Sequence, residues 1–196
     1  PLVFVHGYNR NAREQLELLR PLADQLQRAL LAPYFAKEQH PRYQRLGRGS
    51  DGERADGYFD SCLQEAAREL HIETRRIVLI GFSGGAQFAH RYSMLHPHRV
   101  EKLIAVAAGW YTFPDCETAY PRGLDVRGKL RRANPNPESF LAVPTTVIVG
   151  EDDCDDANLR HGERLDRQQG STRVERARRW VLAMRMAARR YGVAAD

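Results

Sequence analysis

Ser83 lies in the sequence GFSGG at residues 81–85, which has the spacing G-x-S-x-G. The four residues before this pentapeptide, 77–80, are apolar and mostly β-branched, as in a short buried strand. The residues after it have helical periodicity. A serine on so sharp a turn needs small neighbours, which the glycines at either end supply. The spacing predicts that Ser83 is a nucleophile. It also predicts that the Gly84 amide, at the start of the helix, stabilises an oxyanion.

Strand and helix signals alternate along the 196 residues, which predicts one α/β domain with a mainly parallel sheet. The expected strands lie at residues 2–5, 30–35, 77–80, 100–108 and 143–149. The expected helices lie at residues 11–26, with Asn11 as N-cap, at 55–70 and at 84–95. A last one starts with the capping-box residues Thr172 and Glu175 and has an apolar stripe that predicts docking on the sheet. Residues 110–141 are rich in proline and aromatic residues and then in charge, so they predict a lid-like or irregular excursion from the core.

Composition excludes several classes of function. The formal charge is +5, but arginine scattered among acids supplies nearly all of it, which argues against a nucleic-acid surface. No apolar run is long enough to span a membrane. Cys62, Cys116 and Cys154 have no metal-ligand spacing, so we expect neither a metal nor a disulfide framework. No signal peptide is visible, and the compartment, cytoplasmic or secreted, and the oligomeric state stay open.

Three elements in order resemble the α/β-hydrolase superfamily: HGY at residues 6–8, GFSGG at 81–85 and GEDD at 150–153. The resemblance implies a three-layer α/β/α sandwich over residues 1–196, incomplete at both ends. The segment GFSGGAQFAHRYSMLHPHRV, followed by GWYTFPD, is also similar to bacterial hydrolases related to polyester depolymerases and feruloyl esterases.

The resemblance also implies residue roles. Tyr8, after the HG pair, matches the supplier of a second oxyanion amide, and His6 matches a residue that braces the oxyanion loop. The triad acid matches the loop after the later strand. Asp153 fits the G-x-x-D pattern there, with Asp152 and then Asp155 as alternatives.

The chain departs from the family pattern at the triad histidine, which the resemblance places after one further strand beyond the last helix. Serine without a base is a poor nucleophile at neutral pH. One explanation is that residues 1–196 are a fragment whose histidine lies beyond Asp196, and the start at Pro1 inside a strand favours this. A second is that His161 has taken over. A third is a chain that binds without catalysis.

Another histidine, His90, lies on the helix that follows Ser83. Seven residues of helix separate the two, about 10 Å along the axis, so His90 is too far from Ser83 to act as its base.

The expected reaction is hydrolysis of a small or polymeric carboxylic ester through a Ser-His-Asp acyl-enzyme, without a cofactor. Trp110 and Tyr111 follow a strand end on the face of Ser83, so they are candidates for the wall of a substrate pocket. Packing beneath residues 110–141 is the equal alternative for these rings. A serine peptidase of the same superfamily and a non-catalytic binding protein are the alternative functions.

Overall fold

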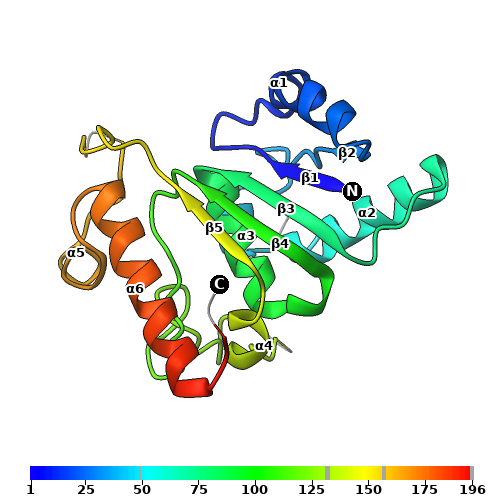
Figure 1. The fold of residues 1–196 in the computed structure, drawn as a ribbon. Coiled ribbons are helices and arrows are strands. Elements are labelled where there is room, and N and C mark those ends of the chain that lie inside the picture. Colours follow the sequence, from blue (N-terminus) through cyan, green and yellow to red (C-terminus); the bar gives the residue numbers. More distant parts are fainter. Residues whose placement is uncertain (49, 131–132, 156–157, 195–196) are drawn as a thin grey trace.

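A parallel sheet of five strands forms the centre of the molecule (Figure 1). A computed structural model describes residues 1–48, 50–130, 133–155 and 158–194. The strands lie in the order β2-β1-β3-β4-β5, and each neighbouring pair is parallel. Their bounds are β1 (Leu2–Val5), β2 (Leu30–Leu31), β3 (Ile77–Phe82), β4 (Val100–Val106) and β5 (Thr145–Ile148).

Helices connect the strands, as parallel pairing requires. The α-helices are α1 (Ala12–Gln25), α2 (Ala55–Leu70), α3 (Gly84–Leu95), α4 (Pro137–Leu141), α5 (Glu163–Gln169) and α6 (Arg173–Tyr191). Two short 3-10 helices, η1 (Tyr43–Arg45) and η2 (Pro97–Arg99), complete the set among the described residues.

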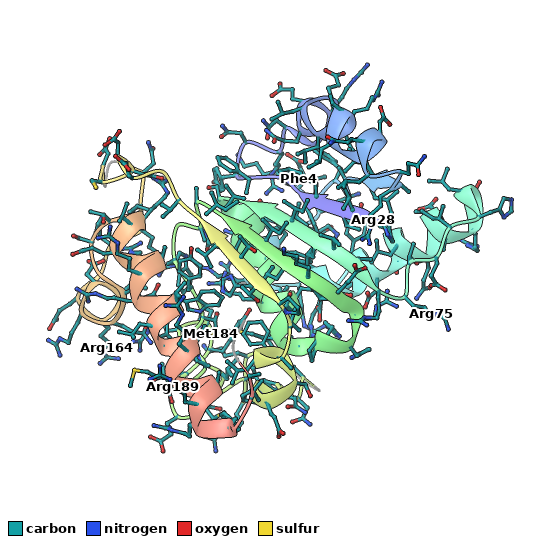
Figure 2. All side chains as sticks on the ribbon, in the orientation of Figure 1. Phe4, Arg28, Arg75, Arg164, Met184 and Arg189 are labelled. Atoms are coloured by element: carbon teal, nitrogen blue, oxygen red, sulfur yellow. The ribbon has the colours of Figure 1, made fainter. Side chains whose placement is uncertain are left out.

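The helices cover both faces of the sheet and so make three layers. Successive strand residues point to opposite faces. Val3 and Val5 of β1 belong to a large core that also contains side chains of α2, α3 and α6. Leu2 and Phe4 belong to a smaller core with Ala23 of α1, and Figure 2 shows Phe4 on the side of the sheet nearer α1. The predicted three-layer arrangement and parallel sheet are confirmed.

The last helix, α6, docks on this core through one face. Thr172 caps it, since its hydroxyl accepts a hydrogen bond from the Glu175 amide (3.2 Å). The indole of Trp180 is buried and donates a hydrogen bond to the Thr112 carbonyl oxygen (2.7 Å). In Figure 2, Met184 points toward the sheet and Arg189 points outward. The cap by Thr172 was expected from the residue types at 172 and 175, and the docking face from the apolar periodicity. The Glu175 carboxylate accepts from the Ser171 amide (2.7 Å).

Other expectations about the elements were only partly right. Leu22 and Leu26 continue the apolar periodicity of α1, yet they are 43% and 51% exposed, whereas Ala23 and Leu19 pack in the smaller core. The side chain of Asn11 does not cap α1 but donates to the Glu14 carboxylate (3.0 Å). The second strand is two residues long, and Pro33, which lacks an amide donor, follows it closely.

In the part that the structure describes, residues 110–136 form turns and an isolated bridge between Ala119 and Asp125, and α4 ends the excursion. No described helix has the length and hydropathy needed to cross a membrane. The three cysteines are free thiols.

Replacement of Trp180 by alanine tests the docking of α6. We expect Trp180→Ala to lower the free energy of unfolding by about 3 to 5 kcal/mol, because it leaves a cavity in the core. Leu182→Ala, on the same helix at a position 59% exposed, is the control and should change this free energy by less than about 0.5 kcal/mol. Urea unfolding followed by circular dichroism measures both. Equal losses in the two variants would contradict the docking.

Candidate active site

The turn between β3 and α3 holds Ser83 in a backbone conformation that is rare for a residue with a side chain, with φ 52° and ψ −110°. A Cβ atom at Gly81 would lie 2.3 Å from the Gly85 carbonyl oxygen, and one at Gly85 would lie 1.9 Å from the Val5 carbonyl oxygen. Glycine is therefore required at both positions, as the spacing predicted. Ser83 itself is partly exposed.

The loop that follows β1 lies against this turn. A Cβ atom at Gly7 would be 3.5 Å from the Ser83 Cβ, and one at Gly84 would be 3.4 Å from the backbone nitrogen of Tyr8. The Tyr8 amide has no hydrogen-bond acceptor among the described residues. Gly84 begins α3, and the first amides of a helix have no partner within it. Two unused amide donors therefore lie beside Ser83, which is the composition of an oxyanion hole.

His6 is fully buried in this loop, and both of its ring nitrogens are engaged. Nε2 accepts a hydrogen bond from the Phe35 amide (3.0 Å), so Nδ1 carries the proton and donates to the Gly7 carbonyl oxygen (2.9 Å). The Tyr43 hydroxyl donates to the His6 carbonyl oxygen (2.8 Å). Burial lowers the pKa of His6, which keeps the imidazole neutral. In this geometry His6 braces the loop and has no free nitrogen to accept the proton of Ser83.

A cleft of about 650 Å³ opens over Ser83. Its lining comes from segments that follow β1, β3, β4 and β5, so it lies at the carboxyl edge of the sheet, where ligands of open α/β sheets bind. The lining residues are Gly7, Tyr8, Asn9, Asn11, Phe82, Ser83, Ala107, Asp153, Asn158 and Arg173. The structure thus brings together the expected nucleophile, the loop that carries the Tyr8 amide and the expected acid.

Asp153 is the expected acid that the structure places in this cleft. Its Oδ1 accepts a hydrogen bond from Nη1 of Arg173 at 2.8 Å, and both side chains are partly buried. Asp152 and Asp155 are exposed and do not line the cleft. The Asp153 carboxylate is therefore oriented by a guanidinium of α6.

Among the described residues, no histidine lines the cleft. His161 lines a different cavity, and its Nδ1 lies 3.3 Å from an Asp166 carboxylate oxygen. His90 is fully buried, and both of its ring nitrogens are hydrogen-bonded. Its Nδ1 donates to the Ala86 carbonyl oxygen (2.8 Å), and its Nε2 accepts from the Thr112 amide (2.9 Å). Burial holds the pKa of His90 well below its ordinary value. The structure does not bring either histidine to Ser83.

Trp110 and Tyr111 do not line the Ser83 cleft either, so the structure does not support them as its wall. Tyr111 is fully buried and stacks on Trp180 with the ring centroids 4.8 Å apart. Trp110 is 5% exposed and lines the cavity that contains His161. The contacts of these rings lie elsewhere: Tyr111 packs on α6, and Trp110 has the guanidinium carbons of Arg45, Arg91 and Arg160 within 5.9 Å of its ring centroid.

Sequence reasoning missed Arg173, Asn158 and Ala107 as lining residues. Arg173 begins α6, and no motif marks its pairing with an acid 20 residues earlier. Ala107 has φ 50° where β4 ends. No group of three His, Cys, Asp or Glu side chains in the described part of the chain is arranged to hold a metal ion.

The contact between α3 and β1 can be tested with one methyl group. Gly85→Ala should lower the free energy of unfolding by about 3 kcal/mol or more, because its Cβ would overlap backbone atoms that cannot move independently. Gly162→Ala is the control, since a Cβ at Gly162 would meet nothing within 4 Å, and its effect should stay below about 1 kcal/mol. Denaturant unfolding measures both. A mild effect at Gly85 would show that the turn is looser than the structure indicates.

Acid should destabilise the protein through His6. The pKa of His6 is lowered by folding from its ordinary value of 6.5, so below that pH the unfolded chain binds a proton that the folded chain does not. The stabilisation is thus present above pH 6.5 and is lost as the pH falls toward the folded pKa, by up to about 1.4 kcal/mol per pH unit. The slope of unfolding free energy between pH 6.5 and 5.5 should be shallower in His6→Gln. Equal slopes in the two proteins would contradict this assignment.

Comparison with known proteins places this arrangement in a family. The model of the alpha/beta hydrolase family matches residues 2–193. Poly(aspartic acid) hydrolase-1 from Sphingomonas sp. KT-1 has 24% sequence identity and a TM-score of 0.83, and the alignment covers 99% of this chain and 77% of that one. The poly(3-hydroxybutyrate) depolymerase LpqC from Bordetella parapertussis has 26% identity and a TM-score of 0.82, with 99% of this chain and 70% of that one covered.

A carboxylesterase from Mesorhizobium loti is more distant, at 16% identity with a TM-score of 0.53 over 100% of this chain and 77% of that one. No curated protein matches the sequence. The family match spans nearly the whole chain and agrees with the parallel sheet and the strand-turn-helix at Ser83. The chain belongs to the alpha/beta hydrolase family.

Proposed function

We propose that this chain is a serine hydrolase that cleaves a carboxylic ester through an acyl-enzyme formed on Ser83. The observation that carries the proposal is the position of Ser83, on a left-handed turn in an open cleft with the Tyr8 and Gly84 amides beside it. The similarity to a poly(3-hydroxybutyrate) depolymerase supports an ester as the substrate class. The polymer itself is a polyester, so a polymeric ester is included in the proposal.

In the proposed reaction the Ser83 oxygen attacks the ester carbonyl carbon and loses its proton to a base. The Tyr8 and Gly84 amides donate hydrogen bonds to the oxyanion of the tetrahedral intermediate. In comparable sites one such donor contributes about 3 to 4 kcal/mol to transition-state stabilisation. The alcohol then leaves with the proton from the base. Water next attacks the acyl carbon and gives a proton to the base, and the bond to the Ser83 oxygen breaks as that oxygen takes the proton back, which releases the carboxylic acid.

The base of a serine triad is a histidine held by an acid. We propose Asp153 as that acid, because its carboxylate lines the cleft with Ser83 and Arg173 fixes its orientation. The described lining of the cleft contains no histidine, and we propose that the imidazole comes from protein outside residues 1–196. Tests of activity therefore use the whole gene product.

Labelling by a fluorophosphonate tests the nucleophile. The whole gene product should be labelled on Ser83 and should hydrolyse 4-nitrophenyl butyrate, because an activated serine attacks both reagents. Ser83→Ala should lose the label and lower kcat/KM about a thousandfold or more. Peptide mass spectrometry locates the label, and absorbance of 4-nitrophenolate measures the rate.

A matched control is Ser93→Ala, which changes a buried serine of α3 whose hydroxyl donates to the Ala89 carbonyl oxygen (2.9 Å). This variant should keep the label and the rate. Absence of label in well-folded protein would overturn the proposal and favour a binding protein. Preferential cleavage of a 4-nitroanilide would instead identify a peptidase.

A further inference from the structure

A second cavity, of about 380 Å³, lies next to the segment between β5 and α6. It shares no described lining residue with the Ser83 cleft. The two are neighbours along the chain, because Asn158 lines the cleft and Arg160 lines this cavity. We call it the arginine cavity, because its lining includes Trp110 and the four arginines Arg45, Arg122, Arg160 and Arg164.

The arginine cavity carries an excess of positive charge. Its four arginines form no ion pair with any carboxylate in the described part of the chain. Glu163 also lines the cavity, but it is paired with Arg167 at 2.6 Å. Arg164 belongs to α5 and points away from the core (Figure 2). Guanidiniums that line one cavity without a carboxylate partner favour an anion there.

Three guanidinium groups lie close to the ring of Trp110. The central carbons of Arg91, Arg45 and Arg160 lie 4.4, 5.4 and 5.9 Å from the ring centroid, within the range of cation–π attraction. Arg91 is 1% exposed, and its Nη2 has no hydrogen-bond partner among the described atoms. One indole ring offsets only part of the repulsion among three cations. Burial lowers the pKa of Arg91 to about 10, so it stays charged at neutral pH.

The wall of the cavity is held in place before any ligand binds. The Tyr120 hydroxyl donates to the Arg45 carbonyl oxygen (2.8 Å), and Nη2 of Arg176 donates to the Arg160 carbonyl oxygen (3.0 Å). Nε of Arg45 is buried without a partner in the described part of the chain. Such a preformed site loses little conformational entropy when it binds a ligand.

We propose that the arginine cavity is a binding site for an oxyanion, a carboxylate or phosphate group of a small molecule, held between Arg45 and Arg160 over the indole of Trp110. The oxyanion supplies hydrogen-bond acceptors for the guanidinium donors and a negative charge that balances their positive charge. The site is separate from the proposed nucleophile, so binding does not depend on turnover.

Tryptophan fluorescence reports binding directly, because Trp110 lies in the cavity. The whole gene product is titrated at pH 7 and constant ionic strength with citrate, with sodium phosphate, or with sodium chloride. We expect a saturable change with citrate or phosphate and none with chloride. Tighter binding of citrate identifies a carboxylate ligand, and tighter binding of phosphate identifies a phosphate ligand.

The double variant Arg45→Gln/Arg160→Gln should bind the preferred anion about tenfold or more weakly, which is the loss of at least one charge-assisted hydrogen bond. The control Arg13→Gln/Arg75→Gln removes the same charge from side chains that are 93% and 86% exposed, and it should bind as the wild type does. Melting curves check that each variant is folded.

If the double variant unfolds, the single variant Arg160→Gln, at an exposed position, replaces it and should also bind the anion more weakly than the wild type. Ser83→Ala should bind the anion unchanged, so a failure of the hydrolase proposal leaves this one intact. Equal responses to chloride, citrate and phosphate would overturn it. Equal affinities of the wild type and the arginine variants would also overturn it.

Discussion

The site depends on the close contact between the start of α3 and the end of β1. A Cβ atom at Gly85 would lie 1.9 Å from the Val5 carbonyl oxygen, so the helix approaches the neighbouring strand as closely as backbone atoms allow. This contact sets the loop of residues 6–8 against the turn at Ser83. It thereby places the Tyr8 amide of that loop beside Gly84, the first residue of α3. Without it, neither the left-handed turn nor the pair of donors would be held in place.

Buried arginines hold the loops at the carboxyl edge of the sheet. Arg176 is fully buried and donates to the Gly170, Gly109 and Arg160 carbonyl oxygens and to the Asp166 carboxylate. A buried charge is costly unless hydrogen bonds satisfy it, and these four acceptors do so. The hydrogen bonds tie α6 to three separate segments of chain. Arg91 differs because its hydrogen-bond partners are uncharged, and its guanidinium lies 4.4 Å from the centroid of the Trp110 ring.

Most of the sheet and the turn at Ser83 could be predicted from the sequence. The apolar runs and the helical periodicity are local patterns, and they located four strands and the main helices to within a few residues. The glycines of GFSGG carry tertiary information in a local pattern, because only a residue without Cβ fits where strand and helix close up. The N-terminal cap of α6 by Thr172 was also predictable, because its hydrogen-bond partner, Glu175, is only three residues away in the sequence.

The sequence by itself therefore determined the strand-turn-helix at Ser83, the order of the elements and the absence of room at Gly81 and Gly85. Only the tertiary structure decided that Tyr111 stacks on Trp180, that Trp110 belongs to a second cavity and that Arg173 pairs with Asp153. Those partners lie far apart in the chain. Which side chains meet is set by how α6 packs on the core, and no spacing in the sequence records that packing.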